Sequence, residues 1–254
     1  MVVILEGHCR VTRIREGEPS INGTLSIWSP IGRATGASKI SLRTMEFARG
    51  LSPGYRNQEC DEVSYVLQGT ATVYIDGYQY VVQPETGIYL KPGAILTVDN
   101  LGPEPFVLIS SQCPEPRTPA EMLPPVTSPR ESETSPPPKA PIVRLADRKA
   151  EKTEDRRYRV LIDDEVESKQ VTQFVGSIPH GRAPDHFHPY EEVLVVLSGE
   201  GLMRAGEKDA PIAVGSCIYL PEAQTHCVEN TGEDELRVLG VFYPAGSPGE
   251  KYNA

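Results

Sequence analysis

Three histidines and one glutamate stand in a pattern that can bind a metal ion. His186 and His188 are separated by one residue, Glu192 follows closely, and His226 comes from further along the chain. Three imidazoles and one carboxylate suit first-row divalent metals, whereas calcium and magnesium need more oxygen ligands. The set therefore predicts one divalent transition metal, with iron as the leading choice and manganese, nickel, cobalt or zinc as alternatives.

The spacing indicates that β-strands carry these side chains. Alternate residues of a strand point to the same face, so His186 and His188 would lie side by side. His226 must come from a different strand, and a closed barrel holds two such strands in fixed positions. Open coordination positions beside such a set are typical of a catalytic site. A pair of surface histidines would explain His-x-His alone, but it does not account for Glu192 and His226.

The sequence contains an internal repeat. At an offset of 130 positions, which joins Glu62 to Glu192, further residues match without a gap: Val66-Leu67 with Val196-Leu197, Gly69 with Gly199, Ile88-Tyr89-Leu90 with Ile218-Tyr219-Leu220, and Asn100 with Asn230. In the first copy the histidine positions hold Arg56, Gln58 and Leu96. Leu96 cannot ligate and Arg56 adds a positive charge, so we expect no metal there. Arg56 would instead pair with Glu62 in a structural barrel or, alternatively, serve an anion-binding pocket.

A proline-rich segment divides the two copies. Between Cys113 and Pro141 the run Pro136-Pro137-Pro138 and many further prolines are interleaved with Ser, Thr and Glu. Proline removes backbone donors and disfavours helix and central strand, so we expect an extended linker, with a ligand for a proline-recognition domain as the alternative. The predicted organisation is a first barrel without metal ligands at residues 1–112, the linker at 113–141 and a metal-binding barrel at 142–254.

Both copies have the pattern of short strands with period two, separated by turns. The first copy predicts strands at 63–67, 71–75 and 78–82, and the second at 171–177, 193–197, 201–205, 217–220, 226–228 and 236–242. Helical periodicity is nearly absent, and the best helix candidate, residues 146–159, is too polar all round for a core helix. The pattern predicts an all-β sandwich or barrel.

The composition excludes several classes of function. The formal net charge is −10 and no Lys/Arg-rich run stands out, so we expect no nucleic-acid partner. The apolar start, residues 1–5, is too short for a signal sequence, and no apolar stretch approaches the roughly 20 residues that span a membrane. The five cysteines are scattered and never form Cys-x-x-Cys, which argues against a disulfide framework. We therefore expect a cytoplasmic protein with a small-molecule substrate and no membrane partner.

The motifs resemble those of the cupin superfamily. The stretch His186-Phe187-His188-Pro189-Tyr190-Glu191-Glu192 with Gly199 is similar to the first cupin motif, and Gly215, Pro221, His226 and Asn230 are similar to the second. Two positions depart from the pattern: Ala223 replaces a glycine, and four residues instead of five separate Gly181 from His186. Because both copies match, the resemblance implies a bicupin, with two β-barrels of the jelly-roll type (double-stranded β-helix). By fold analogy it also implies a homodimer formed through exposed strand edges.

Strand parity gives weaker candidates for the rest of the site. If Glu192 and His226 point inward, so do the substrate-pocket candidates Leu194, Val196, Gln224 and Val228. The candidates for binding a substrate carboxylate are Arg182 and Arg204, with a role as surface charges as the alternative. The candidates for donating a proton or orienting bound oxygen are Tyr190, Tyr219 and Gln173. This largely apolar lining favours an apolar or aromatic substrate held by a few polar groups.

These features favour an enzyme. The leading hypothesis is a dioxygenase-type oxidoreductase at the second barrel, acting on a small, aromatic or enolisable organic acid that chelates the metal. The first alternative is a non-oxidative isomerase, lyase or decarboxylase, and the lack of ligands in the first barrel excludes a two-metal form of it. The second alternative is a module that binds a small ligand without turnover. Ligand type alone leaves both the metal and the substrate open.

Overall fold

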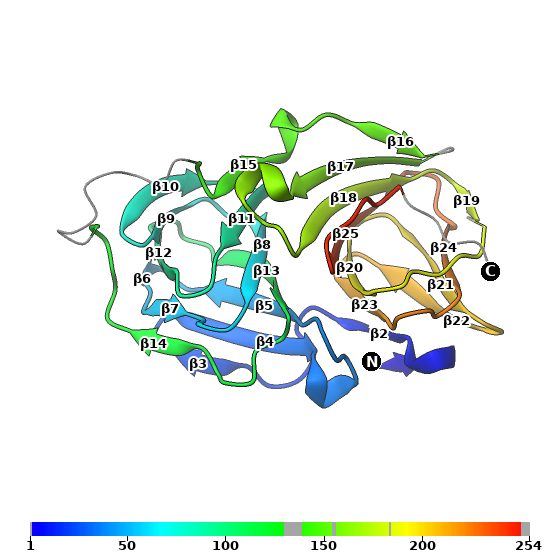
Figure 1. Ribbon diagram of the computed structural model, residues 1–254, viewed down its shortest axis with the longest axis horizontal. Helices are drawn as coiled ribbons and strands as arrows, with labels where there is room; N and C mark the ends of the chain where they lie inside the picture. Colours follow the sequence, from blue (N-terminus) through cyan, green and yellow to red (C-terminus); the bar gives the residue numbers. More distant parts are fainter. Residues whose placement is uncertain (1, 130–138, 154–155, 183, 250–254) are drawn as a thin grey trace.

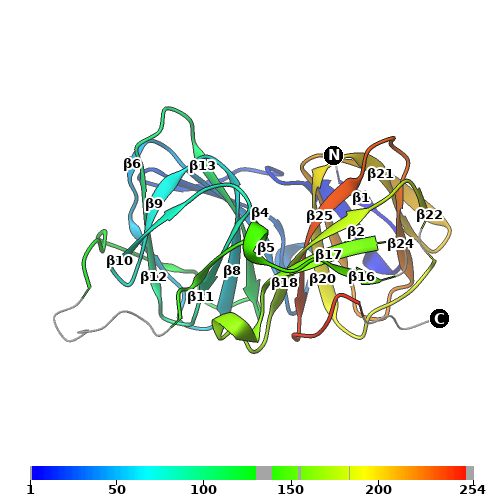
Figure 2. The same cartoon turned by 90° about the horizontal axis from the view of Figure 1, so that it is seen from above.

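The computed structural model describes residues 2–129, 139–153, 156–182 and 184–249, and these are built almost entirely from β-strands. Figure 1 shows two barrels side by side, and in the view from above (Figure 2) each is a ring of strands. Within the described residues, the helical elements are four single 3-10 turns. The prediction of an all-β protein with two barrels is confirmed.

The first barrel combines two antiparallel sheets, with the strand orders β15-β11-β8-β13-β5-β4-β3 and β10-β9-β12-β7-β14, and with β6 paired to β12. The strands of the first sheet are β3 (Ser20–Asn22), β4 (Leu25–Ile31), β5 (Leu42–Phe47), β8 (Asp61–Gln68), β11 (Thr86–Leu90), β13 (Phe106–Cys113) and β15 (Ile142–Arg144). Those of the second are β6 (Gly50–Leu51), β7 (Gly54–Arg56), β9 (Ala71–Ile75), β10 (Tyr78–Val82), β12 (Ile95–Asn100) and β14 (Glu121–Leu123).

The second barrel repeats this design with the strand orders β1-β2-β23-β20-β25-β18-β17-β16 and β19-β24-β21-β22. The strands of its larger sheet are β1 (Val3–Ile4), β2 (Arg10–Arg13), β16 (Glu151–Thr153), β17 (Arg156–Ile162), β18 (Thr172–Ile178), β20 (Glu191–Ser198), β23 (Ser216–Leu220) and β25 (Leu236–Tyr243). Those of its smaller sheet are β19 (Gly181–Arg182), β21 (Glu200–Ala205), β22 (Lys208–Ala213) and β24 (His226–Asn230).

Strand alternation divides the apolar side chains between the barrel interiors and the interface between the barrels. Along β20, Leu194 and Val196 belong to the core of the second barrel. Val193 and Val195 point the other way, into a core that contains residues of both barrels. A third core fills the first barrel. One strand with apolar residues on both faces, as expected for a strand buried on both sides, therefore serves the barrel and the interface together.

The strand pairings cross the domain boundaries that the repeat suggested. β2 pairs with β23, so residues 10–13 extend the sheet of the second barrel, not of the first. In return β15 pairs with β11 of the first barrel, and β14, inside the expected linker, pairs with β7. Each exchange covers an edge strand that would otherwise expose unpaired backbone groups. The run Pro136-Pro137-Pro138 lies outside the described residues.

The polar stretch 146–159 is not a helix. It contains β16 and the start of β17, which pair in antiparallel register. Its charged side chains alternate with buried ones along β17, as the period-two pattern of a half-exposed strand requires.

All five cysteines are buried and unpaired, as their scattered positions predicted. Among the described residues, no helix is long and apolar enough to cross a membrane.

Candidate metal centre

Three histidines meet at the mouth of the second barrel. His186 forms a β-bridge with His226, the first residue of β24: the His186 N–H donates to the His226 carbonyl at 3.0 Å, and the His226 N–H donates back at 2.8 Å. His188 follows on the same face as His186. The ligand atoms of the three imidazoles lie within 4.8 Å of one another, close enough to hold one metal ion.

Backbone carbonyls orient two of these imidazoles. Nδ1 of His186 lies 3.1 Å from the Pro184 carbonyl, and Nδ1 of His226 lies 2.8 Å from the Gln224 carbonyl. A carbonyl partner on Nδ1 fixes the tautomer that leaves Nε2 as a lone-pair donor, the usual support for a metal-binding histidine.

The third imidazole is held by packing. The ring of His188 stacks on Tyr190, with ring centroids 4.8 Å apart, and Tyr190 stacks in turn on Phe242. Nδ1 of His188 is buried and has no hydrogen-bond partner among the described residues. A buried nitrogen without a partner is costly, and the chemistry of the whole group fits a divalent cation.

Glu192 lies beside the three imidazoles but is not part of their compact group of ligand atoms. Its carboxylate is buried, and Oε2 lies 3.5 Å from Nε2 of His188. Burial raises the pKa of Glu192 to about 8. Burial, followed by the charges of neighbouring histidines, lowers the pKa of His188 to about 3 and that of His226 to about 4. The imidazoles of His188 and His226 are therefore neutral at neutral pH, the state that binds metal, while the Glu192 carboxylate lacks a partner that would favour its charged form.

The ligand group opens into a cavity of about 100 Å³ inside the second barrel. Three of the residues predicted for the pocket or for catalysis line it, Tyr190, Leu194 and Val228, together with the predicted ligand Glu192. It also contains residues that the sequence analysis did not select, among them Arg156, Tyr158, Phe174 and Ile178. Most of the wall is apolar, and Arg156 places a cation near the histidines, where it contributes to the lowered pKa of His226.

The Cupin domain model matches the chain twice, at residues 43–111 and 174–242. Together these segments cover more than half of the sequence. The chain belongs to the cupin family. Since both barrels match, it is a bicupin, as the motifs suggested.

Known relatives match this bicupin over short segments. Auxin-binding protein 1 from Arabidopsis thaliana is 37% identical over 73 residues, which cover 25% of this chain and 37% of that protein. An oxalate-binding protein from Thermotoga maritima is 36% identical over 58 residues, covering 22% of this chain and 48% of that protein. The chain thus spans less than half the length of these two relatives.

Solved structures match over nearly the whole bicupin. A mutant of Bacillus subtilis oxalate decarboxylase superimposes with a TM-score of 0.75 at 14% identity, covering 96% of this chain and 78% of that one. A putative glyoxylate-induced protein from Pseudomonas aeruginosa gives a TM-score of 0.73 at 16% identity, covering 100% and 92%. At these identities the similarity shows the shared fold.

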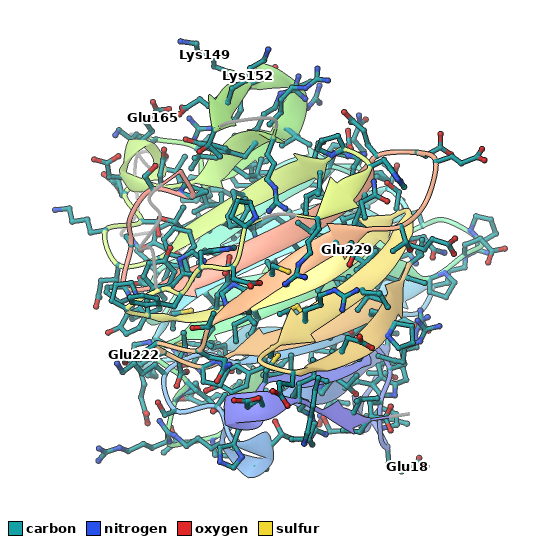
Figure 3. The ribbon with its side chains drawn as sticks, turned by 90° about the vertical axis from the view of Figure 1, so that its right-hand side faces the viewer. Glu18, Lys149, Lys152, Glu165, Glu222 and Glu229 are labelled. Atoms are coloured by element: carbon teal, nitrogen blue, oxygen red, sulfur yellow. The ribbon has the colours of Figure 1, made fainter. Side chains whose placement is uncertain are left out.

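The two arginines predicted to hold a substrate carboxylate lie outside the cupin cavity. Arg182 is exposed and pairs with Asp185 at 3.0 Å. Arg204 pairs with Glu229 at 2.7 Å, and Figure 3 shows Glu229 on the outer face of the sheet that contains β21 and β24. Both have the surface role that was the alternative for them. The cavity is lined instead by Arg156, with Arg157 beside it. Arg156 was not among the predicted residues because β17 begins inside the polar stretch, to which no strand parity was assigned.

Four further candidates also lie away from the cavity lining. Gln173 is buried on the face of β18 opposite Phe174, and Tyr219 points into the interface between the barrels. Val196 belongs to the core of the second barrel without lining the cavity. The Gln224 side chain donates to the Thr225 carbonyl, and only its backbone oxygen supports His226. Parity places a side chain on a face, but not at a given depth.

In the first cupin barrel the register differs by one residue from the expected one. Tyr55 pairs with Leu96 just as His186 pairs with His226, so Tyr55 occupies the position expected for Arg56. By the same step Asn57, not Gln58, corresponds to His188. Gly50 already indicated this shift, because it precedes Tyr55 by the same number of residues as Gly181 precedes His186.

The predicted pair of Arg56 with Glu62 does not form. Arg56 turns outward to Glu121, 2.6 Å away, while Glu62 pairs with the buried Arg43 at 2.6 Å. The Tyr55 hydroxyl donates to Glu62 at 3.0 Å, and Ser110 donates to it at 2.6 Å. A guanidinium thus neutralises the carboxylate that corresponds to Glu192.

The position of Arg43 explains why the second barrel has an open cavity. Arg43 pairs with Ser110 in the first barrel, and Phe174 pairs with Gly240, which stands 130 positions after Ser110. A Cβ atom on Gly240 would lie 2.3 Å from the Phe174 ring, so glycine is required there. The second barrel therefore has an aromatic wall where the first has an internal cation.

Proposed function

We propose that this bicupin is a metal-dependent oxygenase that acts on a small organic acid in its second barrel. The observation that supports it is the placement of three histidines, Glu192 and the Arg156 guanidinium around one small, mostly apolar cavity. A metal and a guanidinium can bind two ends of a small acid, and the apolar wall excludes water.

The residues that would hold the metal are His186, His188 and His226, with Glu192 as the fourth ligand. When bound there, the metal supplies Lewis acidity toward a chelating acid and redox access to dioxygen. Arg156 would bind the substrate carboxylate; its Nη2 already donates to the Val228 carbonyl at 3.2 Å, which limits its motion. Phe174 and Leu194 would pack against the apolar part of the substrate.

The lining favours oxygenation over decarboxylation. After loss of carbon dioxide, the carbanion must receive a proton from a positioned acid. Among the described residues, Glu192 is the one carboxyl group that lines the cavity. Apart from Tyr190, the other acidic group in the lining is Tyr158, whose hydroxyl donates to Glu151 at 2.9 Å. In this proposal Glu192 would be taken up by the metal, and the Tyr158 hydroxyl is already bonded to Glu151.

A metal-dependent decarboxylase is the second candidate. The Thermotoga relative is named for oxalate binding, and the fold of oxalate decarboxylase matches over 96% of this chain. A small cavity lined by the Arg156 guanidinium also suits a short dicarboxylic acid.

Metal analysis and oxygen uptake test the proposal. Protein purified without chelators is analysed by mass spectrometry for bound metal and is then supplied with a panel of 2-hydroxy, 2-oxo and dicarboxylic acids. We expect about one metal per chain, its loss in His188→Ala and its retention in His180→Ala, because His180 hydrogen-bonds Gly232 outside the cavity. Turnover that consumes dioxygen supports the oxygenase.

Other outcomes select the alternatives. Carbon dioxide release without oxygen uptake favours the decarboxylase. Tight binding of an acid without product, detected as a thermal shift, favours a binding module. A metal-free wild-type protein, or metal retained in His188→Ala, contradicts the metal site itself.

A further inference from the structure

Glu191 is a buried carboxylate directly before Glu192, yet it faces the first barrel. Its exposed fraction is 4%, and neighbouring residues of β20 point to opposite faces. Glu192 therefore points into the metal cavity, while Glu191 points into the interface between the barrels. A buried carboxylate needs donors, and the first barrel provides them.

The turn at Ser38 and Lys39 of the first barrel holds Glu191 by its backbone. The Ser38 N–H lies 3.0 Å from Oε1 and 3.1 Å from Oε2, and the Lys39 N–H donates to Oε2 at 2.7 Å. The Ser38 hydroxyl also donates to Oε1, and the Tyr219 hydroxyl of the second barrel donates nearby to the Gly36 carbonyl at 3.5 Å. Both carboxylate oxygens are thus held by the turn of the other barrel.

The same turn contacts the segment that leads to the third histidine. Nζ of Lys39 lies 2.7 Å from Oε2 of Glu222, which Figure 3 shows beside the N-terminal half of the chain. The next residue, Ala223, donates its N–H to the His188 carbonyl at 2.7 Å, and His226 follows. One turn is therefore bonded to both segments that carry ligands.

We propose that the Ser38–Lys39 turn is a positioning element of the metal centre, acting through Glu191. This inference rests on the proposed metal site and gives the barrel without the histidines a function. Hydrogen bonds that fix the backbone at Glu191 also fix where β20 places the Glu192 carboxylate, since the two residues share a peptide. Outer contacts of this kind determine how firmly a ligand set retains its metal.

The repeat supplies a matched control on the other side of the interface. Asp61 stands 130 positions before Glu191 and is also buried. It accepts from Tyr89 at 2.7 Å and from Gln170 of the second barrel at 3.2 Å. Its neighbour Glu62 is neutralised by Arg43, so the same type of bond there supports no ligand set.

The experiment compares Glu191→Gln and Ser38→Ala with Asp61→Asn in the full-length protein loaded with Mn²⁺ alone. We measure the rate of Mn²⁺ release to a chromogenic chelator, the electron paramagnetic resonance spectrum of bound Mn²⁺ and the urea midpoint of unfolding. We expect Glu191→Gln to release Mn²⁺ about tenfold faster with a changed spectrum. Asp61→Asn should stay within about twofold of wild type, although both variants weaken the interface.

The outcomes separate this inference from the proposed function. If wild type binds Mn²⁺ and Glu191→Gln releases it no faster than Asp61→Asn does, the positioning role is overturned while the metal site stands. A wild type that binds no Mn²⁺ overturns both. Should Glu191→Gln fail to fold, Ser38→Ala decides, because Ser38 is exposed and only its hydroxyl is removed; an unchanged release rate there counts against the proposal.

Discussion

At the scale of single residues, burial sets the charge of each group around the histidines. The pKa of Glu192 is raised to about 8 by burial alone, whereas those of His188 and His226 are lowered to about 3 and about 4. Without a metal ion, the cavity therefore favours the neutral forms of Glu192, His188 and His226. A bound divalent metal would favour the charged form of the Glu192 carboxylate, and it would bind the imidazoles in the neutral form that they already have.

Replacing Glu192 should have opposite effects on the metal-free and metal-loaded protein. The folded-state pKa of about 8 exceeds the usual 4.5. The cost of burying this carboxyl is therefore absent below about pH 4.5, grows with pH and is complete above about pH 8. We expect Glu192→Gln to raise the melting temperature of the metal-free protein at about pH 8.5, to leave it unchanged near pH 4.5 and to weaken metal retention.

Thermal unfolding with and without a chelator, across this pH range, measures both effects. The lowered pKa values of His188 and His226 act in the opposite pH direction. Keeping these histidines neutral costs no stability above about pH 6.5, and stability is lost as the pH falls toward about 3, because the unfolded chain then binds protons that the folded protein does not. If the metal-free Glu192→Gln protein is no more stable than wild type at alkaline pH, the conclusion that the Glu192 carboxylate is buried without a compensating partner is wrong.

Arg156 should determine affinity for the substrate carboxylate. Removing a charged hydrogen-bond partner costs about 2 kcal/mol, so we expect Arg156→Gln to raise KM by roughly 30-fold for an acid. The matched controls, Arg182→Gln and Arg204→Gln, keep the cavity intact because their partners lie outside it. Steady-state kinetics, or thermal shift with a bound acid, measures the difference. Equal losses in all three variants would assign the effect to net charge.

At the scale of elements, the N-terminal strand belongs to the barrel that carries the three histidines. β2 covers the edge of β23, and Val11, with an exposed fraction of 4%, packs into the core of the second barrel. The first dozen residues of the chain therefore stabilise a site that lies more than 170 positions later.

Truncating Val11 should destabilise the second barrel. Burial of a valine side chain contributes about 2 kcal/mol, so Val11→Ala should lower the free energy of unfolding by that amount and reduce metal retention. Ile21→Ala is the control, because Ile21 is 68% exposed and its truncation should cost less than about 0.5 kcal/mol. Urea unfolding, with metal content measured alongside, gives both values. A loss of stability without any loss of metal would separate β2 from the site.

At the scale of the whole molecule, the two cupin barrels share a core and a hydrogen-bonded interface while only one has the histidines. The exchanged strands β2 and β15 and the contacts of Glu191 and Asp61 join them. We expect one cooperative unfolding transition, since neither barrel has a complete sheet without strands from the other half.

Homodimerisation is the further prediction at this scale. β10 and β22 end their sheets, and exposed apolar side chains lie close to them, Val81 on β10 and Val214 after β22. Such edges pair readily with a second copy. Light scattering should give about twice the chain mass of 27.9 kDa. A single-chain mass at micromolar concentration would contradict the dimer.

Local features of the sequence determined most of the strands and the placement of the candidate ligands. The predicted strands 71–75 and 78–82 match β9 and β10 residue for residue, since period-two patterning and hairpin turns are local signals. Strand parity and the cupin motif both predicted that His186, His188 and His226 lie together, and their ligand atoms are within 4.8 Å of one another. Glu192 lies in the same cavity, as both also predicted.

Only the tertiary structure decided what depends on pairing between distant segments. The one-residue shift that places Tyr55 opposite Leu96, the partnership of Glu62 with Arg43 and the entry of Arg156 into the cavity all follow from strand register. Register is set by contacts across the sheet, and neither composition nor local period encodes it fully. The hold of the first barrel on Glu191 is of the same kind, because the two hydrogen-bonded segments lie about 150 residues apart in sequence and meet only when both barrels have folded.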